Sequence, residues 1–184
     1  MTNWSRIVFA VVALAATVGT ARAAPLSWAE AVGELAGERT KAESCAALLK
    51  GVGDKREIAR GQADYGEAKA VFDGVIAELS VALDTGQNPK SLASLDADLE
   101  KGATARAAFC QHVHDRLDAG ATGRKGALED ILKAGVTPAV QSLRDAVATL
   151  YSDHRKDDEL TRATIKTQLE AARWPDFETI KAAR

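Results

Sequence analysis

The sequence lacks the residue patterns that mark the common catalytic sites. A Gly-x-Ser-x-Gly nucleophile turn, a phosphate-binding glycine loop and a dinucleotide-binding glycine fingerprint are all absent. Carboxylates are plentiful, with 26 Asp and Glu residues, but no spacing marks two of them as a catalytic pair. We therefore expect a protein that is not an enzyme and name no catalytic residue.

Haem and metal motifs are missing as well. There is no Cys-x-x-Cys-His for covalent haem and no Glu-x-x-His of the di-iron bundles. Met1 is the only methionine, and it lies in an N-terminal segment that we expect to be cleaved. His114 with Asp118, and His154 with Asp158, have a zinc-compatible spacing, but two ligands each are typical of ordinary surface pairs. We expect no metal and no cofactor.

The chain has no excess of positive charge. It carries 24 Lys and Arg against 26 Asp and Glu, for a net charge of −2. Loss of Arg6 and Arg22 with a signal peptide would leave the mature chain at −4. This balance argues against a nucleic-acid-binding protein and against an anionic membrane surface as partner.

The N-terminus has the pattern of a secretory signal peptide. Arg6 gives a positive start, the apolar run 7–18 is short for a membrane span, and residues 21–23 form a small-x-small cleavage site. An uncleaved anchor is the alternative. We expect a signal peptide at 1–23, a single helical-bundle domain at 24–184, no membrane span in the mature chain, and a periplasmic or secreted location.

Only two cysteines are present, Cys45 and Cys110. An even pair in an oxidising compartment favours a disulfide over a metal site. The bond would close a loop of 65 residues, for which the chain-entropy model gives a stabilisation of about 4 kcal/mol.

The helical pattern is clearest at 55–84. Apolar residues recur there in steps of three and four, which places them on one face of an α-helix, and alternation by two is absent. Asp54 is the expected N-cap, Glu57 would complete a capping box, and Gly86 would end the helix. The stripe comprises Tyr65, Ala68, Phe72, Val75, Ile76, Leu79, Ala82 and Leu83.

The same pattern predicts two further long helices. The first is expected at 28–50, with a capping box of Ser27 and Glu30. The other is expected from an Asn88 N-cap and Pro89 to about Asp118.

The rest of the chain predicts a lid and a last long helix. A short helix at 127–134 is expected as a lid over one bundle end, and Thr137 is expected to cap the last long helix. That helix either continues or kinks at 157–158, and Trp174-Pro175 ends it.

These elements predict an all-α, up-down-up-down four-helix bundle with one disulfide and a short extra helix between the third and fourth. In this topology the first and third helices are parallel, so the late cysteines on both meet at one level. A descending fourth helix would bring Trp174 beside Trp28.

Two arginines interrupt the apolar stripes. Arg39 and Arg106 lie six and four residues before their cysteines, so the disulfide puts them within about 3 Å in height. Tyr65, and Tyr151 or Asp145, are expected near that level. A buried guanidinium needs a partner. The arginines either reach the bundle edge, pair internally with Asp64, Glu67, Asp145 or the tyrosine hydroxyls, or flank a pocket for a small anion.

We therefore expect an exported, non-enzymatic interaction or scaffold protein with an unknown protein partner in the cell envelope. The expected contact surfaces are the connector 120–126 and the charged segment 153–159. The alternative is a protein that binds a small anionic ligand through Arg39, Arg106 and Tyr65, with Tyr151. The sequence does not predict the oligomeric state.

Overall fold

Every regular element in the described part of the chain is an α-helix. The computed structural model describes residues 26–87, 90–117, 122–153 and 159–182, so the expected signal peptide lies outside it. The predicted all-α class is confirmed. The helices are α1 (Trp28–Leu49), α2 (Lys55–Thr85), α3 (Leu92–Arg116), α4 (Thr122–Lys133), α5 (Val136–Asp153), α6 (Glu159–Ala171) and α7 (Phe177–Ala182).

The first two helices begin at the predicted caps. The Ser27 hydroxyl accepts from the Glu30 backbone N–H, and the Glu30 carboxylate accepts from the Ser27 backbone N–H at 2.7 Å, which completes the capping box. Asp54 accepts from the Arg56 backbone N–H at 2.7 Å. The second capping box was wrong, because the Glu57 carboxylate lies instead 3.4 Å from Nε2 of His112 on α3.

The third long helix begins later than its sequence suggested. Its N-cap is Ser91, whose hydroxyl accepts from the Ser94 backbone N–H at 3.2 Å. The predicted start at Asn88 was therefore wrong, and residues 88–89 lie outside the described residues. The polar side chain nearest to the apolar stripe acts as the cap.

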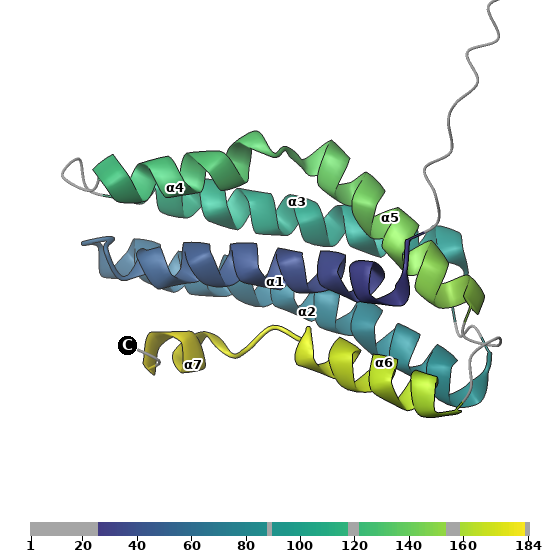
Figure 1. Cartoon of the computed structure of the whole chain (residues 1–184). Helices are drawn as coiled ribbons and strands as arrows, with labels where there is room; N and C mark the ends of the chain where they lie inside the picture. The colour runs from purple at the N-terminus through teal and green to yellow at the C-terminus, as the bar shows by residue number, and fades with distance from the viewer. Residues whose placement is uncertain (1–25, 88–89, 118–121, 154–158, 183–184) are drawn as a thin grey trace, which may run out of the picture.

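The predicted boundaries of the next two helices were also wrong. α4 begins at Thr122, five residues before the expected start, and Figure 1 shows it lying along α3 rather than closing one end. α5 begins at Val136, so Thr137 lies in its first turn. Gly135, at φ 71°, separates the two helices because glycine adopts this left-handed conformation without strain.

The chain packs as five antiparallel segments rather than four (Figure 1). α1, α2 and α3 alternate in direction, α4 and α5 return along α3, and α6 and α7 reverse again. α6 lies along α2, where Lys166 pairs with Asp84 at 2.6 Å and Ser80 donates to Glu170 at 3.0 Å. Whether a helix continues through 157–158 is a question about residues outside the described part.

The reversal before α6 overturns the expected contact between Trp28 and Trp174. Trp174 follows α6, which runs in the same direction as α1, so it reaches the middle of the bundle and not the start of α1. Its indole stacks on Phe72 of α2, with ring centroids 5.1 Å apart and planes 20° from parallel. Trp28 packs on the edge of the core instead.

The predicted disulfide is confirmed. Cys45 of α1 and Cys110 of α3 are bonded, with their Cα atoms 5.3 Å apart, and both are fully buried. Because each cysteine lies late in its helix, the bond requires α1 and α3 to be parallel, as the topology predicted. None of the described helices is long and apolar enough to cross a membrane.

Glycines inside the helices differ in how closely other side chains approach them. A Cβ at Gly61 would lie 2.7 Å from Cδ1 of Leu49, and one at Gly102 would lie 3.1 Å from the Phe72 ring and from Val71. A Cβ at Gly74 would have nothing within 4 Å. Gly74 therefore lowers helix stability and does not allow a closer packing contact in exchange.

This difference gives a stability test. We expect Gly74→Ala to raise the free energy of unfolding by about 0.5–1 kcal/mol, since alanine is the better helix former. Gly102→Ala gains the same propensity but pushes against Phe72, which is fixed by Trp174, so we expect it to lose this gain or reverse it. Chemical denaturation of both variants measures the difference. Equal stabilisation by the two substitutions would contradict the packing described at Gly102.

Candidate functional site

A charge pair is buried between α1 and α3. The Arg106 side chain is 1% exposed, and its Nε donates to Oε2 of Glu38, also buried, at 2.8 Å. The ammonium group of Lys41, which is partly exposed, lies 2.5 Å from the other carboxylate oxygen of Glu38. The pairing offsets the large cost of removing both charges from water. Arg106 is thus satisfied internally, which was one of the three expected arrangements.

The carboxylate that pairs with Arg106 was not among those expected. The candidates were Asp64, Glu67 and Asp145; Asp145 instead accepts from Gln141 on its own helix at 3.0 Å. The signal for Glu38 was present, since it lies three residues after Leu35 and four before Ala42 in the buried stripe of α1. It was missed because neighbouring Arg39 was assigned to that stripe.

Arg39 lies at the edge of the bundle rather than inside it. Its side chain is 34% exposed, Nε donates to Glu43 at 2.6 Å, and Nη1 donates to the carbonyl oxygen of Ala171. This is the edge arrangement expected for a long cationic side chain. Arg39 and Arg106 therefore have separate carboxylate partners, and the anionic-ligand site stays a prediction.

Tyr65 holds the chain that follows α6. Its ring packs against Phe109, Trp174 and Phe177 at centroid distances of 5.6, 5.5 and 5.8 Å. Its hydroxyl donates to the carbonyl oxygen of Pro175 at 2.8 Å. Burial raises the pKa of this hydroxyl, and the negative charge of Glu43 raises it further.

Asp73 of α2 fixes the same segment through backbone contacts. One oxygen of its carboxylate accepts from the Trp174 backbone N–H at 3.1 Å, and the other accepts from Lys69 at 2.6 Å. Arg173 donates to the Asp73 carbonyl oxygen at 3.4 Å. With Tyr65 and Arg39, these contacts anchor the segment between α6 and α7 across α1 and α2. The side chain of Tyr151, the fourth predicted site residue, lies outside the described part.

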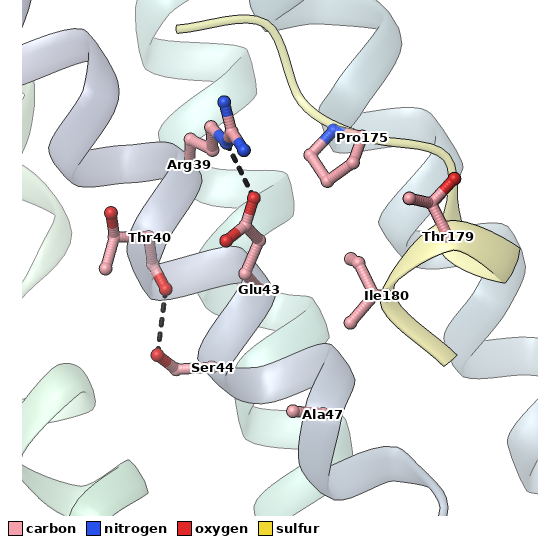
Figure 2. A pocket seen from close by; sticks show the side chains of 8 residues that line it. All are labelled: Arg39, Thr40, Glu43, Ser44, Ala47, Pro175, Thr179 and Ile180. Atoms are coloured by element: carbon pink, nitrogen blue, oxygen red, sulfur yellow. Dashed lines mark hydrogen bonds and ion pairs between the residues drawn. The ribbon is translucent and has the colours of Figure 1, made fainter. Parts of the chain in front are cut away.

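A cleft lies between α1 and α7 (Figure 2). It encloses about 370 Å³. In Figure 2, Arg39, Glu43 and Ala47 line the cleft from α1, and Pro175 and Ile180 line it from the C-terminal segment. The guanidinium and the carboxylate neutralise each other at 2.6 Å, so the cleft carries no net charge from its lining residues.

A second cleft of about 200 Å³ lies on the other side of α7. It shares Ala47 and Ile180 with the first cleft, and α2 forms its opposite wall. Its lining residues are Ala46, Ala47, Lys50, Ile58, Gln62, Phe177, Ile180 and Lys181.

Three large exposed apolar residues belong to helix segments at the other end of the molecule. Among the described side chains the large exposed hydrophobics are Val81, Leu92 and Leu160, at 44%, 38% and 79% exposure. They lie near the end of α2 and at the starts of α3 and α6, which share one end of the bundle (Figure 1). The apolar end defined by these three residues was not predicted from sequence.

The described residues include no group of three or more His, Cys, Asp or Glu side chains placed to hold a metal ion. His114 contacts Asp115 at 3.1 Å and Glu129 at 3.8 Å. Its predicted partner Asp118, and the pair His154 and Asp158, lie outside the described residues.

No protein-family model, curated protein or solved structure matches this chain.

The buried charge pair should behave as one unit in stability measurements. We expect Arg106→Met to lower the free energy of unfolding by about 3–5 kcal/mol, because it leaves the Glu38 carboxylate buried beside only Lys41. The double variant Glu38→Leu with Arg106→Met should lose less than Arg106→Met alone. Arg39→Met is the matched control, since its exposed pair should contribute about 1 kcal/mol or less. Additive losses in the double variant would contradict the pairing.

The buried Tyr65 hydroxyl should make the protein sensitive to alkali. The pKa of Tyr65 is higher in the folded protein than in the unfolded chain. Below about pH 10 the hydroxyl is protonated in both states, so its contribution to the free energy of unfolding is fully present. Above about pH 10 the unfolded chain loses this proton first, so the contribution falls as the pH rises. At pH 8, Tyr65→Phe should lose about 1 kcal/mol with the Pro175 hydrogen bond. By pH 11 this difference from the wild type should shrink by about 1 kcal/mol. Urea unfolding at several pH values measures it, and a constant difference would contradict a buried, protonated hydroxyl.

Proposed function

We propose that this protein is a non-enzymatic interaction module of the cell envelope, which docks a protein partner through its apolar end. The observation that carries the proposal is that three large exposed apolar residues, Val81, Leu92 and Leu160, belong to helix segments at the same end of the bundle. Scattered exposed apolar residues are normal on soluble proteins, whereas a cluster of them is typical of a contact surface.

The helix registers support a shared surface at this end. α2 and α3 are antiparallel, and their register packs Phe72 against Gly102 and Tyr65 against Phe109. Continued toward the end of α2, this register brings Val81 level with the start of α3, where Leu92 lies. The register of α6, set by Lys166 with Asp84, carries Leu160 just past the end of α2.

The envelope location rests on two features of the chain. The first is the N-terminal pattern of a positive residue, an apolar run and a small-x-small site. The second is the disulfide between Cys45 and Cys110, a bond that persists in oxidising compartments. Of the earlier candidates for contact surfaces, 153–159 lies largely outside the described residues, whereas 122–126 of the connector 120–126 form the start of α4.

The proposal is tested by capture with a variant of the apolar end. Leu92→Glu and Leu160→Glu place carboxylates in the first turns of α3 and α6, where the helix dipole favours negative charge, so the fold should be retained. After reversible crosslinking in intact cells, we expect a reproducible partner on the tagged wild type. The double variant should retain about tenfold less of it.

The matched control adds the same two charges at the opposite end. Ala59→Glu in α2 and Ala127→Glu in α4 are both exposed sites away from the apolar end. The control should capture the partner as the wild type does. Equal loss in both variants, equal capture in both, or no reproducible partner on the wild type would each count against the proposal.

A further inference from the structure

The second cleft, on the α2 side of α7, is lined by apolar side chains together with two lysines. Ile58 of α2 and Phe177 and Ile180 of α7 supply its apolar walls. Lys50, at the end of α1, and Lys181 of α7 also line the cleft. The cleft lies at the end of the bundle opposite to the apolar end, so it is independent of the proposed docking surface.

The two lysines differ in how they are neutralised. Lys181 lies 3.3 Å from the Glu178 carboxylate, which also accepts from Gln62 at 3.4 Å. Lys50 is exposed and has no ion-pair or hydrogen-bond partner for its ammonium group among the described residues. An unpaired cation therefore borders apolar walls, and this combination suits a molecule with an anionic head and an aliphatic tail.

The size of the cleft restricts the length of that tail. At about 30 Å³ for a water-sized group, 200 Å³ holds about seven such groups. This is below the range of about 300–1,000 Å³ for pockets that bury drug-sized ligands. This volume suits one unbranched chain of six to eight carbons better than the two chains of a diacyl lipid.

We propose that this cleft binds a short-chain aliphatic carboxylate of about six to eight carbons. Its carboxylate pairs with the Lys50 ammonium group, and its tail lies against Ile58, Phe177 and Ile180. The cation that lines the first cleft is already neutralised, because Arg39 is paired with Glu43 and bonded to the carbonyl oxygen of Ala171.

Calorimetric titration with butanoate, hexanoate, octanoate and decanoate at constant ionic strength tests the proposal. We expect affinity to rise about fourfold for each added methylene, because each one is buried on binding. The rise should stop at a chain length of about eight carbons. 1-Hexanol, which matches the length of hexanoate without the charge, should bind about tenfold more weakly than hexanoate.

Two surface substitutions should change hexanoate affinity in opposite directions. Lys50→Gln should weaken it about tenfold, to the level of 1-hexanol, while the control Lys55→Gln, outside the cleft, should leave it unchanged. Glu178→Gln removes a competing carboxylate from Lys181 and Gln62 and should strengthen hexanoate binding about threefold. None of the three sites is buried, so the fold should be retained.

Amide chemical shifts distinguish the two clefts. Hexanoate should perturb the amides of residues 46–50, 58–62 and 177–181 and leave residues 39–44 of the first cleft unchanged. Any one of four results would overturn the proposal. Two concern the ligand series: equal affinity for hexanoate and 1-hexanol, or no binding of octanoate at 10 mM, which is about the upper limit of a useful titration. The others are equal affinity of Lys50→Gln and wild type for hexanoate, and binding that maps to residues 39–44.

Discussion

The pairing of Glu38 with Arg106 is the constraint on which the rest of the bundle depends. Two charges removed from water are tolerated only while they remain in contact, so α1 and α3 must stay side by side at this level. The disulfide from Cys45 to Cys110 adds a second fixed point, one to two turns further along the same two helices. Together the ion pair and the disulfide fix the relative direction and axial position of α1 and α3. α2 and α5 cover the remaining faces of these two helices.

The C-terminal segment depends on the same frame but is held by fewer apolar contacts. Tyr65 and Asp73 fix its backbone on α2, and Arg39 fixes it on α1. Beyond Trp174 no side chain of α7 is fully buried, so the short helix stands between two clefts and does not fill either one. The proposed ligand cleft therefore lies where the core ends, and the proposed docking surface lies at the opposite end of the bundle.

The class, the three long helices and the disulfide could be predicted because each depends on spacing within the sequence. The reversal of chain direction before α6 could not be predicted, because the sequence of 154–158 contains neither glycine nor proline and the apolar periodicity continues on both sides. The wrong prediction that Trp174 lies beside Trp28 followed from this. Glu38 was recoverable from its position in the α1 stripe, but periodicity alone does not choose between adjacent charged residues. The two clefts and the apolar end depend on side-chain packing between distant segments, which local patterns do not contain.

Native-state amide hydrogen exchange with the disulfide reduced tests the central role of the charge pair most directly. With the covalent link removed, the slowest amides should still be those of α1 around residues 38–46 and α3 around 103–113, exchanging together with the free energy of global unfolding. Slowest exchange in α5 or α6, with α1 opening separately from α3, would contradict the account.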